Sequence, residues 1–464
     1  MEEEKSQLKK GVILNYINIG LGNLIPIFYT PVMLQLLGQS EYGLYKLSSS
    51  VTSYLSLVSL GIGSAVTRYL IKYKVEGSKK DEEKILGLFM IIFQIIAMAT
   101  LLIGTFLIFN LHIWYGKSLT SSQLMRMKIL VALMVCNMAI SFSVSPYISV
   151  VNAHEKFVFL QYMNILSTCI APIANLVMLY MGYKSIGMAI STLVINVIVQ
   201  LLYLIYVRKK LRIHARYRKL PLELLKEILV FSFWIFLANV VSQLYSATDT
   251  VMIGAIPALA TVGTAIYNVG NTLNSIVFTM TTGISNVLSP KTNRMVFAGA
   301  NKNELLKFAI SIGRIQAYII SLIVTGFIAF GQPFIYFYAG SKYSDAYWVA
   351  IFMMVPNLIP LVQSVCLNII VAENRHRFRS IVYLGIAILN VIGTWVLMQS
   401  MGIIGAALMT GIALIIGQGF VMNWYYWKKI KLDIPKFWKE VGSVFCIPII
   451  MCIIVKVIAR YVNF

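Results

Sequence analysis

The chain has 464 residues, of which 59% are hydrophobic and only 12% are charged, whereas a soluble domain carries about 25% charged residues. This composition excludes an ordinary soluble protein and indicates a protein of the lipid bilayer. The 39 Lys and Arg residues exceed the 17 Asp and Glu residues and give a net charge of +22. Such an excess also suits a nucleic-acid-binding protein, so the position of the charges along the chain has to distinguish nucleic-acid binding from membrane topology.

Six uncharged runs in the first half are long enough to cross a bilayer, which requires about 20 mostly apolar residues. These runs cover residues 11–40, 47–67, 85–116, 129–153, 157–183 and 185–207. In the first of them, Pro26 and Pro31 predict a bent or broken helix. The basic segment 208–227 that follows is predicted to be a cytoplasmic linker.

The second half contains four further uncharged runs, one run interrupted only by Arg314, and a final run that contains Lys456. These cover residues 228–248, 250–290, 308–341, 346–372, 380–427 and 441–458. As a single helix, 380–427 would be about 70 Å long at ~1.5 Å per residue, so we predict that it turns once, at 399–402. The sequence therefore predicts about thirteen membrane-spanning helices.

The positions of the basic residues follow this topology. If residues 1–10 are cytoplasmic, 30 of the 39 Lys and Arg residues lie at cytoplasmic ends of spans and 8 at outer ends, and Arg314 lies within a span. Basic residues concentrate on the cytoplasmic side of membrane proteins. Topology thus accounts for the positive charge, and no nucleic-acid partner is needed; the basic linker could also contact anionic lipid headgroups.

An internal repeat relates the two halves of the chain. Residues 61–84 align with 283–306 at a constant offset of 222, which pairs Gly61 with Gly283. A second match, between 185–189 and 403–407, is followed three residues later by Thr192 or Thr410. Because each half contains an even number of spans, the repeat is parallel, with its axis along the membrane normal.

The repeat defines the expected fold class and domains. We predict an all-α polytopic membrane protein with two parallel six-helix lobes around a central cavity, and an extra C-terminal helix. The segments are a cytoplasmic N-terminus (1–10), an N-lobe (11–207), a basic cytoplasmic linker (208–227), a C-lobe (228–427) and a cytoplasmic loop with the extra helix (428–464).

Stripes of polar residues at helical spacing occur in the second and eighth spans. The second span includes Ser49 and Ser53, and the eighth includes Asn268, Asn271 and Ser275. The offset of 222 places Asn271 on Ser49 and Ser275 on Ser53. We interpret both stripes as the lining of a substrate cavity, and the alternative is that small polar residues help helices to pack in the membrane.

Ionisable residues inside membrane spans are costly and therefore mark candidate functional sites. Asp249 could bind a coupling cation or a proton, could pair with Lys46 in an outer gate, or could cap a helix end at the headgroups. Glu41 is a second candidate for coupling or gating, unless it lies in water. Arg314 and Arg68 suit a phosphate or pyrophosphate if they face the cavity, because guanidinium groups hold phosphates by paired hydrogen bonds; otherwise they reach the headgroups.

No pattern of a metal site, a cofactor site or an enzyme is found in the sequence. Five scattered cysteines give no disulfide framework, and the four histidines stand far apart. Walker motifs and nucleophile elbows are missing, and the segments outside the spans are short. We expect no catalytic residues, no metal and no cofactor.

Two motifs resemble those of a known family. The element Leu37-Gly38-Gln39-Ser40-Glu41-Tyr42-Gly43-Leu44-Tyr45 and the element Asp249-Thr250-Val251-Met252-Ile253-Gly254 resemble elements of the polysaccharide transporters, or oligosaccharide flippases, of the multidrug/oligosaccharidyl-lipid/polysaccharide (MOP) exporter superfamily. The resemblance covers essentially the whole chain. Members commonly have twelve or fourteen spans. The predicted total of thirteen therefore leaves two alternatives open: a terminal helix is missing, or the last run does not cross the membrane.

The resemblance implies two six-helix lobes that alternate access, and transfer of an undecaprenyl-pyrophosphate-linked oligosaccharide from the inner to the outer leaflet for surface polysaccharide biosynthesis. The implied location is the bacterial cytoplasmic membrane, and the implied partners are membrane lipids and a polysaccharide polymerase or glycosyltransferase. A cation-coupled multidrug exporter of the same superfamily is the alternative, although it would favour more acidic residues within the spans.

Overall fold

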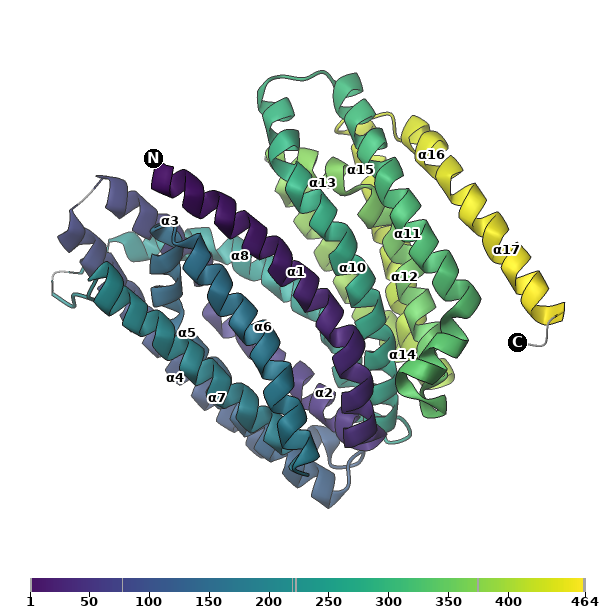
Figure 1. Cartoon of the computed structure of the whole chain (residues 1–464), viewed down its shortest axis with the longest axis horizontal. Helices are drawn as coiled ribbons and strands as arrows, with labels where there is room; N and C mark the ends of the chain where they lie inside the picture. Colours follow the sequence, from purple (N-terminus) through teal and green to yellow (C-terminus); the bar gives the residue numbers. More distant parts are fainter. Residues whose placement is uncertain (1, 77, 219, 222, 374, 462–464) are drawn as a thin grey trace. The chain divides into compact units, whose positions relative to one another are not determined.

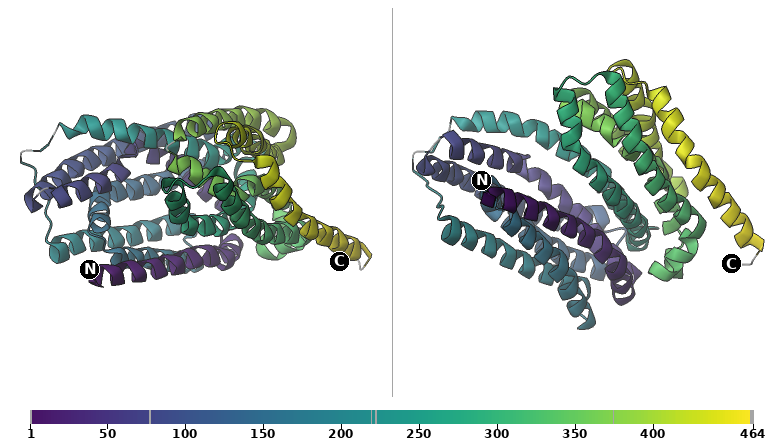
Figure 2. Two further views of the ribbon diagram at one scale, coloured as in Figure 1. Left: turned by 90° about the horizontal axis from the view of Figure 1, so that it is seen from above. Right: turned by 45° about the horizontal axis from the view of Figure 1, so that its top comes forward.

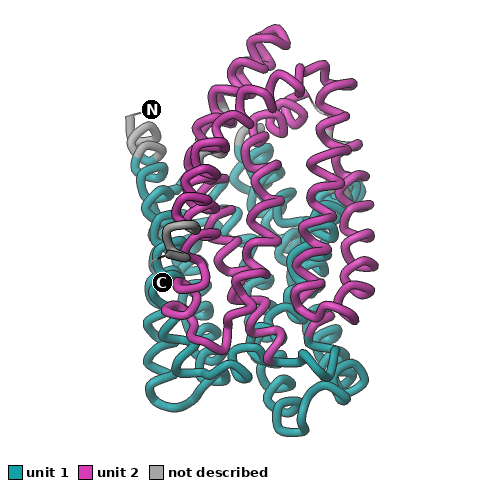
Figure 3. Tube along the Cα trace, turned by 90° about the vertical axis from the view of Figure 1, so that its right-hand side faces the viewer, with its two compact units in different colours: residues 1–247, 254–261 teal, residues 248–253, 262–464 magenta. Residues whose placement is uncertain are grey.

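The computed structural model describes residues 2–76, 78–218, 220–221, 223–373 and 375–461, so the first residue and the last three residues of the predicted terminal segments lie outside it. These residues form helices joined by short loops, without strands (Figure 1). They divide into two compact units, which Figure 3 distinguishes by colour. Unit 1 is Met1–Ala247 with Gly254–Thr261, and unit 2 is Thr248–Ile253 with Val262–Phe464.

Unit 1 contains the first eight α-helices and two short helices of other types. They are α1 (Glu2–Leu37), α2 (Gln39–Ser53), the 3-10 helix η1 (Tyr54–Ser59), α3 (Ile62–Glu76), α4 (Lys79–Tyr115), α5 (Ser121–Ala153), α6 (Phe157–Tyr180), α7 (Lys184–Ile205), the π-helix η2 (Tyr206–Leu211) and α8 (Leu224–Ser246). Side chains cap the free amides at two helix starts, where Ser78 pairs with Asp81 and Thr120 with Gln123.

The core of unit 1 lies between α3, α4, α5 and α7. Leu70, Phe89 and Val150 are among its fully buried residues, and Val199 joins them from α7. At Gly104 of α4 an added Cβ would lie 2.4 Å from a methyl group of Val135, so the glycine lets α5 approach closely.

Two helices of unit 1 differ from the sequence prediction. The first is α1, which continues through Pro26 and Pro31 as one helix, so of the predicted bend or break the break is absent. The second is the second span, which is divided because Leu60 and Gly61 have φ values of 49° and 70°, in the left-handed region. Ser49 and Ser53 of the predicted polar stripe both lie before this division, in α2.

Unit 2 contains the remaining helices. They are α9 (Thr248–Ala255), which unit 1 shares, α10 (Ala260–Phe297), α11 (Lys302–Ala339), the 3-10 helix η3 (Ser341–Tyr343), α12 (Ala346–Val362), α13 (Ser364–Ala372), α14 (His376–Leu414), the π-helix η4 (Ile415–Met422), α15 (Asn423–Lys428), α16 (Ile434–Gly442), the 3-10 helix η5 (Ser443–Phe445) and α17 (Cys446–Tyr461). The capping pair Asn301 and Glu304 begins α11.

Helix α11 is the central packing element of unit 2. It contacts α12 and α13, and also α16 and α17 (Figures 1 and 2). Gln316 of α11 is fully buried and bonds Ser285 of α10 at 2.7 Å and Ser364 of α13 at 3.0 Å. Polar cross-links of this kind position helices where the surrounding lipid supplies no hydrophobic drive for helix association.

The turn predicted at 399–402 is present. Gly402 has φ 57° and ψ −138° and interrupts α14, a conformation that glycine adopts without a Cβ clash. Among the described residues, ten helices are long and apolar enough to cross a membrane, or eleven if α12 and α13, bent by 50°, form one span. The all-α polytopic fold is confirmed, and the total of thirteen, which also includes α10 and both parts of α14, is consistent with this structure.

Candidate functional site

The carboxylate of Asp249 lies at the centre of a buried polar cluster in unit 2. Tyr267 of α10 donates a hydrogen bond of 2.5 Å to its Oδ2, and Thr410 donates one of 2.7 Å to the same oxygen. Thr394 approaches Oδ1 at 3.4 Å. Asp249 is only 2% exposed. All three partners are hydroxyl groups that can donate, as an ionised carboxylate requires.

A fifth side chain, Asn390, completes what we call the Asp249 cluster: Asp249, Tyr267, Asn390, Thr394 and Thr410. The Oδ1 atom of Asn390 lies 3.2 Å from Thr410 Oγ1 and 3.4 Å from Thr394 Oγ1. Its Nδ2 atom is buried and has no hydrogen-bond partner within the described part of the chain. A buried, unsatisfied amide is costly, so the Nδ2 group is a candidate position for a water molecule or another hydrogen-bond acceptor.

The cluster depends on the tertiary structure, because its members come from separate helices. Asp249 is in α9 and Tyr267 is in α10, whereas Thr394 and Thr410 lie on either side of the Gly402 turn in α14. A second cross-link next to it, between Asn268 and Thr250 at 3.3 Å, joins α10 to α9. Sequence reasoning identified Asp249 and Asn268 and missed Tyr267, Asn390 and Thr394; the repeat had marked Thr410.

The first half of the chain holds a related arrangement without a carboxylate. In unit 1, Asn175 of α6 accepts hydrogen bonds from Ser191 at 2.5 Å and from Thr192 at 3.4 Å, both of α7. Thr192 is the residue that the repeat pairs with Thr410. The offset of 222 places Asp249 on Ile27. The charge is therefore specific to the second half of the repeat.

Glu41, the other acidic candidate, is held in unit 1 by neighbouring helices. Arg126 of α5 donates to it at 2.8 Å, and Ser185 at the start of α7 donates to its other oxygen. Next to this pair, Gln123 donates to Ser40 at 3.0 Å. Glu41 is 9% exposed, so it does not simply lie in water, and Arg126 compensates its charge.

The remaining candidates of unit 1 have different surroundings. Ser53 donates to Gln243 of α8 at 3.2 Å, a contact of the helix-packing kind, whereas Ser49 is exposed. Lys46 lies 5.5 Å above the ring of Tyr42. Arg68 is exposed on α3.

The eighth-span stripe changes its character along α10. Asn268 is buried in the cross-link next to the Asp249 cluster, Asn271 is half-buried, and Ser275 is exposed. The stripe therefore begins at the cluster and extends to an accessible surface. The substrate-binding roles of its residues remain predictions.

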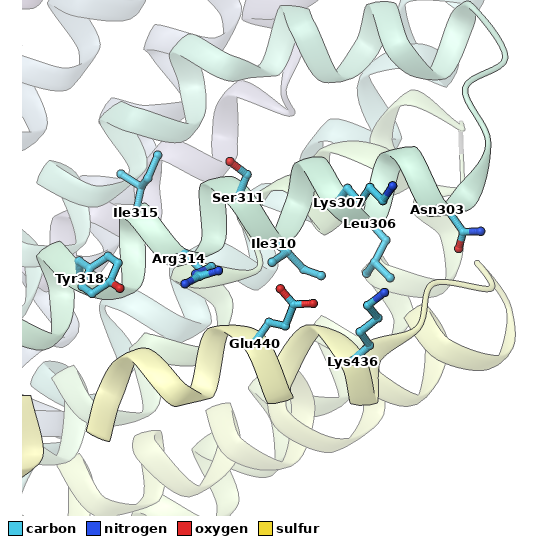
Figure 4. Close-up of a pocket in the computed structure, with 10 residues that line it drawn as sticks. All are labelled: Asn303, Leu306, Lys307, Ile310, Ser311, Arg314, Ile315, Tyr318, Lys436 and Glu440. Atoms are coloured by element: carbon cyan, nitrogen blue, oxygen red, sulfur yellow. The ribbon is translucent and has the colours of Figure 1, made fainter. Parts of the chain in front are cut away.

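Arg314 lines a cleft of about 800 Å³ between α11 and α16. Figure 4 shows Glu440 and Lys436 extending from α16 toward α11, which carries Arg314 and Lys307. Arg314 is exposed, and it takes part in none of the ion pairs found among the described residues. We call this feature the α11–α16 cleft.

The described residues contain no group of three or more His, Cys, Asp or Glu side chains that could hold a metal ion. The donors around Asp249 are instead hydroxyl and amide oxygens, which suit a hard cation such as Na⁺ or a proton rather than a transition metal. The arrangement can thus bind or release one positive charge, and nothing in it supplies a nucleophile with an adjacent base.

Comparison with solved structures shows the fold class. The structure titled "Lipid II flippase MurJ, inward closed conformation" has a TM-score of 0.75 and 17% identity over 98% of both chains. An inward-facing multidrug resistance MATE family transporter of the MOP superfamily has a TM-score of 0.66 and 15% identity over 91% of this chain and 95% of that chain. VcmN, a MATE transporter of Vibrio cholerae, has a TM-score of 0.62 and 14% identity over 94% and 99%.

The chain is therefore a multi-pass membrane protein with the fold of MOP-superfamily transporters. The family model described as "Polysaccharide biosynthesis protein" matches residues 8–294, more than half of the chain. The chain belongs to this polysaccharide biosynthesis family, which confirms the resemblance found in the sequence. In a comparison with curated proteins, no sequence matches the chain.

Proposed function

We propose that this protein is a flippase that moves an undecaprenyl-pyrophosphate-linked oligosaccharide from the inner to the outer leaflet by alternating access, for surface polysaccharide biosynthesis. The observation that carries the proposal is the combination of the family match with the similarity, over 98% of both chains, to a lipid II flippase. The proposed location is the bacterial cytoplasmic membrane, with the N-terminus in the cytoplasm.

The substrate site that we propose contains polar and cationic side chains from both halves of the sequence. Ser49, Asn271 and Ser275 offer the hydroxyl and amide groups that bind sugars. The proposed cationic groups for the pyrophosphate are Lys46, Arg68 and Arg314. Ser53 and Asn268 complete the proposed set. Membrane lipids and a polysaccharide polymerase or glycosyltransferase are the proposed partners.

The Asp249 cluster is the proposed coupling site. Its carboxylate accepts hydrogen bonds from three hydroxyl groups that can each turn away, so binding of a cation or proton at Asp249 would rearrange contacts between α9, α10 and both parts of α14. Such a rearrangement gives the ion different affinities in two conformations, which coupling requires. Glu41 is proposed as a gate residue, because its ion pair with Arg126 joins α2 to α5.

A cation-coupled multidrug exporter is the second candidate function. The similarity to MATE transporters and the buried carboxylate of Asp249 favour it. The two candidates differ in their substrate: a lipid-linked pyrophosphate sugar for the first, and a cationic dye or drug for the second.

Reconstitution into liposomes tests both candidates. A fluorescent prenyl-pyrophosphate oligosaccharide is placed in one leaflet, and its transfer is followed for the wild type, Arg314→Ala and Asp249→Asn. We expect protein-dependent transfer without ATP, reduced in Arg314→Ala through the loss of phosphate binding and in Asp249→Asn through the loss of coupling. If the protein instead extrudes a cationic dye under an ion gradient and transfers no lipid-linked sugar, the exporter function is supported and the flippase function is refuted.

A further inference from the structure

The face of α11 that lines the α11–α16 cleft carries a row of polar residues. Asn303, Lys307, Ser311, Arg314 and Tyr318 follow one another at intervals of four, four, three and four residues, the spacing of a single helical face. The row extends about 20 Å along the helix at ~1.5 Å per residue. It begins at the predicted cytoplasmic end of the helix and reaches into the membrane span.

The equivalent helix in the first half of the repeat lacks this row. At the offset of 222, Lys307, Ser311, Arg314 and Tyr318 align with residues of α4 that are all apolar: Ile85, Phe89, Ile92 and Ile96. Three of these four are buried in the core of unit 1. A membrane helix at this place in a lobe therefore does not need polar residues on this face, and their presence in α11 requires a separate reason.

Helix α16 supplies the opposite wall of the cleft and is firmly held. It buries Ile434, Phe437 and Val441. The ring of Phe437 packs on Gly313, next to Arg314, where an added Cβ would lie 3.1 Å from its Cζ. Trp438 donates a hydrogen bond of 2.9 Å to Asn423 of α15. The charged side chains of α16 thus project from an anchored scaffold, as in interfacial amphipathic helices.

Four cations surround the cleft and an adjoining hollow of about 620 Å³ that shares Arg314. They are Lys307, Arg314, Lys436 and Lys439. Two carboxylates accompany them. Asp433 already caps α16 by accepting from the backbone of Lys436 at 3.1 Å, and Glu440 points into the cleft (Figure 4). No ion pair among the described residues includes any of the four cations.

We propose that the α11–α16 cleft binds the phosphate group of an anionic membrane lipid at the cytoplasmic surface. Lys307, Arg314 and Lys436 would contact the phosphate oxygens, Ser311 would donate a further hydrogen bond, and Tyr318 would lie beside the start of the acyl or prenyl chain. Aromatic residues commonly occupy this level of the membrane. Two sources share this chemistry: a bilayer phospholipid and the diphosphate of a prenyl-linked lipid. For a bilayer phospholipid the inference goes beyond the proposed function, and for a prenyl-linked diphosphate it rests on that function, which already gives Arg314 to the pyrophosphate.

Equilibrium titration of the purified full-length protein in neutral detergent tests the inference. The probes are a short-chain phosphatidylglycerol, geranyl diphosphate and, as the uncharged comparison, a short-chain phosphatidylcholine. We expect binding of an anionic probe that weakens with added salt. The triple variant Lys307→Gln/Arg314→Gln/Lys436→Gln should bind about 100-fold more weakly, at about fivefold for each cation.

Two further variants separate a local effect from a loss of structure. Glu440→Gln removes the carboxylate that faces the bound phosphate and should strengthen binding about fivefold, which unfolding cannot do. Lys80→Gln, at an exposed position on α4, is the matched control and should change nothing. Unchanged binding in the triple variant, or weaker binding in Glu440→Gln, would overturn the inference.

The two probes distinguish the sources. Tighter binding of geranyl diphosphate than of phosphatidylglycerol assigns the cleft to a prenyl-linked lipid, and the reverse order assigns it to a bilayer phospholipid. Because binding is measured without transport, the outcome is independent of the proposed function. If the protein transfers the lipid-linked sugar but its cleft binds neither anionic probe, the inference about the cleft is overturned and the proposed function is not.

Discussion

The hydrogen bond between Tyr267 and Asp249 offers a test of whether the buried carboxylate carries a charge. Tyr267→Phe removes the hydroxyl donor at 2.5 Å and keeps the ring, so it creates no large cavity. Asp249→Asn keeps the shape of the side chain and one carbonyl oxygen but removes the charge. The two substitutions, made singly and together, form a double-mutant cycle that isolates the contribution of the charge to this bond.

The expected magnitude follows from the surroundings of the bond. A hydrogen bond to a charged group contributes about 1.5–3 kcal/mol and a neutral one about 0.5–1.5 kcal/mol, whereas interhelical hydrogen bonds in a membrane protein average about 0.6 kcal/mol. For a charged Asp249 with three hydroxyl partners, we expect the coupling free energy to be about 1 kcal/mol. With a protonated Asp249, the asparagine would mimic the native group and the coupling would approach zero.

The assay is reversible unfolding in mixed micelles, from which the free energy of unfolding of each variant is obtained. The control cycle combines Asp249→Asn with Tyr347→Phe, because the Tyr347 hydroxyl donates to the backbone of Ile328 at 2.9 Å and shares no partner with Asp249. We expect the control coupling to be near zero. A Tyr267 coupling as small as that of the control would refute a charged carboxylate at the centre of the cluster.

Three further predictions concern stability. Arg126→Met should lower the free energy of unfolding by about 1–2 kcal/mol, because it leaves Glu41 buried without its cation, although the half-exposed guanidinium limits the loss. Gly43→Ala should cost about 1–3 kcal/mol or more, because its Cβ would lie 1.8 Å from the carbonyl oxygen of Thr261. Gly402→Ala should cost about 1–2 kcal/mol through its positive φ.

Each of these variants is compared with a control at a position that lacks the ion pair, the close contact or the positive φ. Lys128→Met removes a cation two residues from Arg126 and should have little effect. Gly20→Ala and Gly385→Ala add a Cβ where no heavy atom lies within 4 Å and should change stability by less than about 1 kcal/mol. Equal losses in a variant and its control would show that the named contact does not determine stability there.

The sequence by itself determined the class of the protein and most of its helices. Long uncharged runs must be helical in a bilayer, because the lipid offers no partner for backbone polar groups. The length of 380–427 alone required a turn, and Gly402 provides it. The family resemblance was also recognisable from the sequence elements around Glu41 and Asp249. Each of these features depends on the composition of a single segment of the chain, so no contact with a distant segment is needed to predict it.

Side-chain environments were decided only by the tertiary structure. Asp249 stood out as an acidic residue in an apolar run, but two of its partners lie 145 and 161 residues further along the chain, and periodicity gives no information on such contacts. The second span was predicted as one uninterrupted helix, and the left-handed backbone at Leu60 and Gly61 divides it. Arg314 stood out as a cation inside a span, but only the packing of α16 shows that it shares a cleft with Lys436 and Glu440. Hydropathy fixes which segments enter the membrane, whereas the choice of neighbours depends on the packing of helices that are distant in sequence.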